Sequence, residues 1–298
     1  MNEENVKPRN KFIALLLSVL LPGLGQIYNG QINKAFIFYG AYILIPFILK
    51  ATKIAASFYG VILLYMFLAL SILYIHVDAW RNAKRQQEYI LKKYNKWYFY
   101  ILFYIVLVSG LWFYTESSLN NMFVRSFSVS TTSGAPTLLP GDIIVADMSI
   151  YNNSEPDYGD LVVFIPPYDN QLYIFRVVGK PNDILEINNS EIKINGKAVN
   201  TSFIWNTEID GMSVNEYEEV LPNGHKHFIF KYNTTSDSLK SNMKNILVPS
   251  DCYYLLGDNR GNAFDSRYMG TIGKEQIKGK ATYCYWGRTT DRINIDLR

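Results

Sequence analysis

The sequence contains little cysteine and little histidine. Cys252 and Cys284 are the only cysteines among 298 residues, and there are 3 histidines. Two thiols are too few for a disulfide scaffold or for a four-ligand zinc site. Whether Cys252 and Cys284 pair with each other stays open at this point. We therefore expect neither a metal nor another cofactor.

A strong charge of one sign is also absent. The formal net charge is +3, and it comes mainly from the N-terminal part of the chain. So small a charge does not predict a nucleic-acid partner. The first apolar run has no small-residue cleavage site after it, so we do not expect it to be removed as a signal peptide.

Apolar residues make up 49% of the chain, and they are concentrated in its first part. Segments Phe58–Val77 and Tyr98–Tyr114 are full-length candidates for membrane-spanning helices, which need ~20 residues. The runs at 12–24 and 35–49 are shorter, and Pro46 interrupts the second. We expect an α-helical transmembrane region with about three to four hydrophobic segments.

The division into domains follows from the same contrast. Residues 1–115 form the expected membrane region, and residues 116–298 have the composition of an ordinary soluble domain. The loop at 81–97 is basic, with Glu88 as its only acid, so the positive-inside rule places it in the cytoplasm. The basic N-terminus belongs there too, so one of the short early segments re-enters or lies in the interface. The second domain is then on the outer face.

One membrane stretch has a pattern of its own. The sequence LLSVLLPGLGQIYNGQINKAF resembles a small two-helix membrane module with a PGLGQ-Y-G core, which is found at the start of several bacterial membrane proteins. Its simplest interpretation is a membrane anchor, because apolar spans are usually only spans.

Short runs of β-branched and apolar residues, separated by turn signals, fill the second domain. These spacings predict an all-β domain rather than alternating βαβ units. The expected strands are 142–147, 160–165, 173–178, 184–187, 191–194, 252–256 and a last one around 280–286. The dipeptide Asn195-Gly196 predicts a turn. The region near 201–250 is polar and Asn-rich, and we expect a less regular insertion or second lobe there.

A candidate nucleophile lies where this domain begins. The stretch Thr131–Asp142 reads TTSGAPTLLPGD, with Ser133 followed three residues later by Pro136. Glycine permits unusual backbone angles and proline fixes φ, so the run favours a tight exposed turn. Most turns of this kind are only turns, and the motif alone does not establish catalysis.

Ordered motifs from this stretch onward resemble the membrane-anchored type I signal peptidases. Family members have S-M-x-P-T-L-x-x-G-D at the nucleophile, G-D-[IL]-V-V-F, Y-I-K-R-V-V-G-x-P-G-D, and G-D-N-R-x-x-S-x-D-S-R-x-x-G. The matching segments here are 133–142, 159–164, 173–183 and 257–270. The resemblance covers roughly Phe127 to Trp286, and it implies a signal-peptidase-like antiparallel β fold.

The resemblance also implies a set of site residues. Ser133 takes the place of the nucleophile, and Thr131 that of the hydroxyl which, with the serine N–H, holds the oxyanion. The family's general base is a neutral lysine oriented by a second serine, and these positions hold Phe175 and Ala263. Gly134 replaces the usual methionine. A serine without a base is a poor nucleophile, so the activity is doubtful.

Further positions of the motifs have structural roles by the same resemblance. They are Pro136, Arg176, Asp258, Arg260, Asp265 and Arg267. The charged residues form either a scaffold that pins the nucleophile loop, with Arg176 paired to Asp258, or an exposed ionic turn of little energy. Val129, Val145 and Phe164 either line small apolar pockets for the substrate or simply pack in the core.

No residue is a convincing replacement for the lysine. Lys180 follows a turn glycine, so we expect its side chain to point to solvent. His225 and His227 sit in the polar insertion and are expected to be a surface pair, while His76 belongs to the membrane region.

Two functions therefore stay open. The first is a signal peptidase, a serine endopeptidase that cleaves exported precursors at the outer, periplasmic face of the bacterial inner membrane. The second is an inactive homologue that binds exported or surface proteins as an assembly helper. Either way the expected partners are signal peptides or exported precursors and membrane lipid, with no nucleic acid. We expect the purified protein to cleave a signal peptide weakly or not at all.

Overall fold

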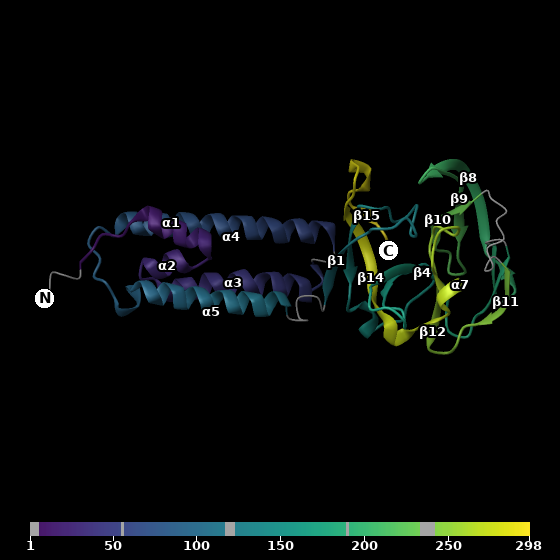
Figure 1. Cartoon of the computed structure of the whole chain (residues 1–298), viewed down its shortest axis with the longest axis horizontal. Helices are drawn as coiled ribbons and strands as arrows, with labels where there is room; N and C mark the ends of the chain where they lie inside the picture. Colours follow the sequence, from purple (N-terminus) through teal and green to yellow (C-terminus); the bar gives the residue numbers. More distant parts are fainter. Residues whose placement is uncertain (1–5, 55–56, 117–122, 189–190, 233–241) are drawn as a thin grey trace. The chain divides into compact units, whose positions relative to one another are not determined.

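The computed structural model describes residues 6–54, 57–116, 123–188, 191–232 and 242–298. The chain divides into two compact units, Met1–Phe123 and Val124–Arg298. The first is helical and the second is built mainly of antiparallel strands (Figure 1). This is the predicted order of an α-helical region followed by a mainly-β domain.

The helical unit contains α1 (Lys11–Leu20), α2 (Leu24–Tyr28), α3 (Ile32–Ala51), α4 (Phe58–Arg85) and α5 (Trp97–Glu116). Of the described helices, α3 and α4 are long and apolar enough to cross a membrane. The prediction that α3 is too short was wrong, because Pro46 lies inside this helix and does not end it. A proline removes one helical hydrogen bond, and long apolar helices tolerate this loss.

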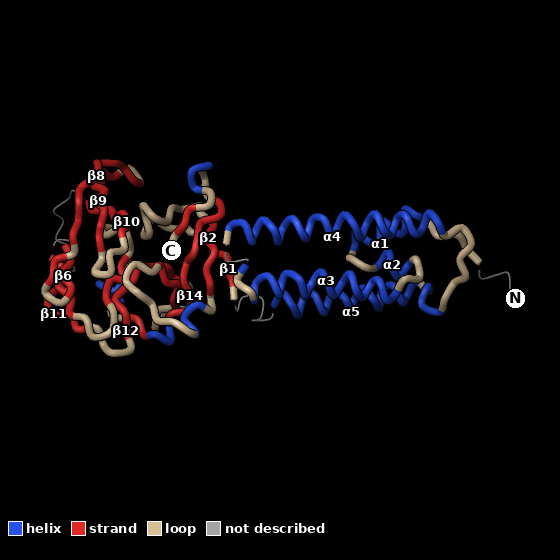
Figure 2. Tube along the Cα trace, turned by 180° about the vertical axis from the view of Figure 1, so that it is seen from behind, coloured by secondary structure: helices blue, strands red, loops and turns tan. Residues whose placement is uncertain are grey.

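The short helices α1 and α2 leave one end of the helical unit and return to it. The Asn10 amide donates to the Tyr28 hydroxyl at 3.1 Å, so the beginning of α1 meets the end of α2. Beyond α2, the Gly30 carbonyl accepts a hydrogen bond from the Tyr94 hydroxyl at 3.0 Å. Both views show α1 beside α4 (Figures 1 and 2). This is the path of a hairpin, and the number of membrane crossings stays a prediction.

The described residues of the second unit form three antiparallel sheets, whose strands are red in Figure 2. The largest has the order β1-β2-β14-β3-β4-β12-β13, with β15 paired to β14. Its strands are β1 (Val124–Ser128), β2 (Ile143–Asp147), β3 (Leu161–Phe164), β4 (Tyr173–Gly179), β12 (Cys252–Leu256), β13 (Ile272–Gly273), β14 (Ile277–Trp286) and β15 (Ile295–Asp296). The four-stranded sheet has the order β11-β5-β6-β7, from β5 (Ile184–Asn188), β6 (Glu191–Ile194), β7 (Lys197–Ala198) and β11 (Asn242–Leu247).

Residue patterns explain why these segments are strands. All residues of β3 are buried, as expected of a continuous apolar run, whereas β6 alternates exposed and buried residues. Asn195 and Gly196 both have positive φ, 52° and 77°, which a tight hairpin turn requires. The strands at 142–147, 160–165 and 173–178 lie where the sequence predicted them, as β2, β3 and β4.

The region near 201–250 is more regular than predicted. It contains β8 (Asn200–Ile209), β9 (Met212–Val220) and β10 (Lys226–Tyr232), which form the third sheet in the order β10-β9-β8. Strand β8 is exposed along most of its length. A strand with two exposed faces has no alternation of apolar and polar residues, which is why its sequence looked irregular.

The cysteines are both free, with Cys284 buried and Cys252 partly buried. Cys284 Sγ lies 3.2 Å from the carbonyl oxygens of Trp286 and Arg292. Its side chain belongs to a buried apolar cluster with Leu138 and Ile144.

Candidate active site

Ser133 lies on a loop that is closed at its base by backbone hydrogen bonds. The Val129 amide donates to the Asp142 carbonyl at 2.8 Å, and the Gly141 amide donates back to Val129 at 2.9 Å. At the tip, the Ser133 carbonyl accepts a hydrogen bond from the Asn259 amide at 3.1 Å. The loop is thus held between β1, β2 and the turn after β12.

A cavity of about 380 Å³ opens beside Ser133, and Thr131, Val129, Leu172, Phe175 and Phe264 also line it. Ser133 is half-buried and Thr131 is exposed. No described residue forms a hydrogen bond with the Ser133 hydroxyl. Ser133 lines the cavity, and no Lys, Arg or His is among the described residues that line it.

Phe175, which lines this cavity, belongs to one apolar cluster with Ala263. They are 5% and 7% exposed, and both pack with Val162, Val177 and Leu255. The Phe175 ring centroid is 5.8 Å from that of Phe164. Neither side chain has an atom that can take a proton.

Gly257 is the point at which the site residues meet. A Cβ atom placed on Gly257 would lie 2.4 Å from Ala263 Cβ, 2.7 Å from the Ser133 carbonyl oxygen and 3.3 Å from Phe175 Cε1. Only a residue without a side chain allows these three to approach so closely. Gly257 was not among the predicted site residues, although its place at the start of the last motif was a usable signal.

The charged residues after Gly257 are buried, so the turn is not an exposed ionic one. Arg176 and Asp258 form a two-pronged ion pair, with Nε to Oδ1 at 2.8 Å and Nη2 to Oδ2 at 2.7 Å. The Thr137 hydroxyl donates to the same carboxylate, which ties the Ser133 loop to the pair. Although burial opposes it, the Arg176 charge holds the pKa of Asp258 below its usual range.

A second buried pair joins this turn to β9. Arg260 Nη1 donates to Glu219 Oε2 at 3.0 Å, and Nη2 contacts Oε1. Glu219 is fully buried, and Arg260 lowers its pKa despite the cost of burial. Glu219 was not predicted as a site residue, because it lies in the region interpreted as an insertion. Asp265 and Arg267, by contrast, pair with each other at 2.8 Å and hold the next turn.

His225 and His227 were wrongly expected to form a surface pair. His227 is buried, and His225 is half-buried with Nε2 at 3.2 Å from Arg176 Nη1. Both line a second cavity of about 380 Å³, which also touches Pro136 and Thr137. Burial and then the Arg176 charge lower the pKa of His225 to about 4. The same two causes lower the pKa of His227.

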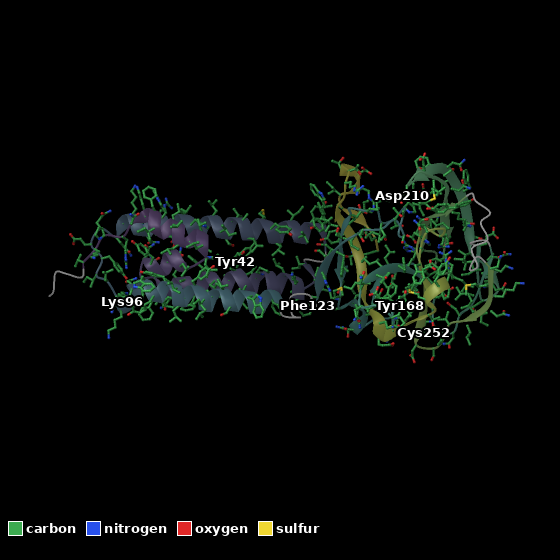
Figure 3. All side chains as sticks on the ribbon, viewed as in Figure 1. Tyr42, Lys96, Phe123, Tyr168, Asp210 and Cys252 are labelled. Atoms are coloured by element: carbon green, nitrogen blue, oxygen red, sulfur yellow. The ribbon has the colours of Figure 1, made fainter. Side chains whose placement is uncertain are left out.

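The remaining candidates, Lys180, Val145 and Phe164, are not among the residues that line the Ser133 cavity. Lys180 is at the surface, as expected, and pairs with Asp157 at 2.9 Å. Val145 and Phe164 are buried in the core and do not line the Ser133 cavity. At the cavity, exposed Phe264 packs edge-on against Tyr168 at 6.2 Å between ring centroids, and Figure 3 labels Tyr168.

Comparisons with known proteins give consistent matches for the second unit. Residues 95–286 match the family described as signal peptidase, peptidase S26, and residues 6–58 match a family of unknown function, DUF5683. Signal peptidase I of Rickettsia typhi is 31% identical over 212 residues, covering 59% of this chain and 80% of the relative. Signal peptidase I of Rickettsia conorii is also 31% identical, over 211 residues, with 59% and 79% covered.

Among solved structures, a signal peptidase I from Enterococcus faecalis V583 is similar over 43% of this chain and 98% of its own. It is 22% identical, and the TM-score is 0.27.

Proposed function

The chain belongs to the signal peptidase family, peptidase S26, and on that premise we propose that it binds signal-peptide segments of exported precursors and cleaves them weakly or not at all. It is a membrane-anchored protein of this family, as its apolar helices α3 and α4 indicate. The binding site we propose is the cavity beside Ser133. The serine would then be a contact residue of that cavity and not an efficient nucleophile.

The observation that carries this proposal is the apolar surrounding of the positions where the family has its base. Phe175 is 5% exposed and Ala263 is 7% exposed, in one cluster of apolar side chains. A serine hydroxyl needs an adjacent group to accept its proton. Loss of a general base slows a reaction on the order of 10²- to 10⁴-fold.

The positions of the two histidines do not make either of them a general base for Ser133. His225 and His227 line a cavity other than that of Ser133, and the Arg176–Asp258 pair lies beside them. Lys180 is engaged with Asp157 at the surface. These placements support the proposal of a site that binds without efficient cleavage.

The first test is cleavage of a signal-peptide substrate by the full chain in neutral detergent. We expect wild type and Ser133→Ala to show the same low rate. Phe175→Lys combined with Ala263→Ser should raise the rate at least about tenfold, because it restores a base within the site. The same pair of changes with Ser133→Ala added is the matched control and should return the rate to background. Robust turnover by wild type that Ser133→Ala abolishes would contradict the proposal.

The binding half of the proposal is tested on the same preparation with a labelled signal peptide. Phe264 lines the cavity and is 54% exposed, so Phe264→Asp adds a charge there without disturbing the core. We expect about tenfold weaker binding, from lost apolar contact. Phe203, also 54% exposed, lies on β8 and supplies the control Phe203→Asp. Equal losses of affinity in both variants would show that the peptide does not bind in the Ser133 cavity.

A further inference from the structure

One end of the helical unit gathers basic side chains. The N-terminal segment runs antiparallel to residues 86–90, with the Lys7 amide donating to Tyr89 at 2.9 Å and the Arg9 amide to Gln86 at 3.0 Å. The basic residues of these segments and the adjoining helix ends are Lys7, Arg9, Lys11, Arg81, Lys84, Arg85, Lys92, Lys93 and Lys96. Figure 3 labels Lys96. Within the described part of the chain, none of them forms an ion pair.

Arg9 has no acidic partner among the described residues. Its side chain lies between the rings of Tyr28 and Tyr89, with Cζ at 4.5 and 4.2 Å from their centroids. The residue is 8% exposed, and Nε and Nη2 are buried without a hydrogen bond among the described residues. Contact with two aromatic rings offsets only part of the cost of burying a cation. An anion nearby would offset more.

Lys11 and Lys84 bring two further cations to this end of the helical unit. Helix α1 and helix α4 pack closely through Ala14 and Ala79, both fully buried. This brings the two ammonium groups to 5.5 and 5.4 Å from the centroid of the Trp80 ring. Among the described residues, no carboxylate pairs with either ammonium group, and two like charges repel each other. An anion bound by both ammonium groups would replace this repulsion by attraction.

We propose that this end of the helical unit binds the phosphate group of an anionic membrane lipid, held by Lys11 and Lys84 beside Trp80. A lipid is the source of the phosphate because the site lies at the end of α4, one of the two candidate spans. Tryptophan is enriched at the level of lipid head groups, and basic clusters next to spans attract anionic lipids. Arg9 positions the N-terminal segment that carries Lys11.

The test is lipid binding to the full chain in a neutral detergent, measured by native mass spectrometry and by the unfolding temperature. Phosphatidylglycerol should bind and raise the unfolding temperature, and phosphatidylcholine should do neither. Lys11→Gln with Lys84→Gln should weaken phosphatidylglycerol binding roughly tenfold or more. The matched control is Lys193→Gln with Lys197→Gln, which changes the charge equally on exposed residues of the β unit.

Several results would overturn the proposal. Unchanged phosphatidylglycerol binding by the Lys11 and Lys84 variant would show that these side chains do not hold the lipid. An equal response to phosphatidylcholine would show that no phosphate charge is recognised beyond the bilayer itself. Inorganic phosphate that stabilises the protein as much as phosphatidylglycerol would identify a free anion as the ligand. An equal loss of phosphatidylglycerol binding in the control variant would indicate a general effect of net charge.

Discussion

At the scale of single residues, the candidate site is held by buried charges. The Arg176–Asp258 pair is almost fully buried and contacts the Ser133 loop through Thr137. A buried pair of this kind gives little net stability compared with an apolar pair, but removing one partner leaves a buried charge unpaired. Its importance is therefore geometric, because it fixes Thr137 and with it the loop.

We expect Arg176→Gln to lower the free energy of unfolding by about 3–5 kcal/mol, because it leaves the Asp258 carboxylate buried without its cation. Lys180→Gln is the control, since the Lys180–Asp157 pair lies at the surface. That change should cost about 0–1 kcal/mol. Urea unfolding of the full chain in detergent, followed by tryptophan fluorescence, measures both. Similar small effects would mean that the buried pair does not hold the fold.

At the scale of elements, the sequence predicted strands where buried residues alternate with exposed ones or follow one another without interruption. Strands β2, β3 and β4 were predicted because their residues face a core on one side or both. Strand β8 was missed because both of its faces are exposed. The partner of Arg260 could not be predicted either, because Glu219 lies 41 residues away and reaches it only through the folding of β9.

The junction between β10 and the turn after β12 should be sensitive to acid. In the folded state, burial and Arg176 lower the pKa of His225 to about 4, and the pKa of His227 is lowered as well. The unfolded chain takes up protons at its ordinary pKa near 6.5. Stability should thus be full above pH 6.5 and fall as the pH drops toward 4, because only the unfolded state binds these protons readily.

Thermal unfolding between pH 4.5 and 7.5 tests this expectation. His225→Gln and His227→Gln should each flatten the decline, whereas His76→Gln, in the helical unit, should leave it unchanged. The lowered pKa values of Asp258 and Glu219 add a further loss only at more acidic pH, where these carboxylates become protonated. If the unfolding temperature of both histidine variants falls with pH as steeply as that of the wild type, other groups cause the acid sensitivity.

At the scale of the whole molecule, the apolar clusters follow the division of the chain. The clusters around Leu24 and around Ala79 contain residues of the helical unit alone. Those around Phe175, Leu185 and Ile144 contain residues of the β unit alone. Every pairing between the named strands of the described chain also lies within residues 124–298. The interactions that fold the β unit are therefore internal to it.

We expect residues 124–298 to fold without the helical unit, because the sheets and the buried pairs of Arg176 and Arg260 are complete in that segment. The isolated segment should show a β-type circular dichroism spectrum and one cooperative unfolding transition. Its free energy of unfolding should fall by about 3–5 kcal/mol in Arg176→Gln, as in the full chain. If the isolated segment aggregates or is rapidly degraded by protease, the helices are needed to stabilise the β unit. If it folds but Arg176→Gln has no effect, the buried pair is not part of its framework.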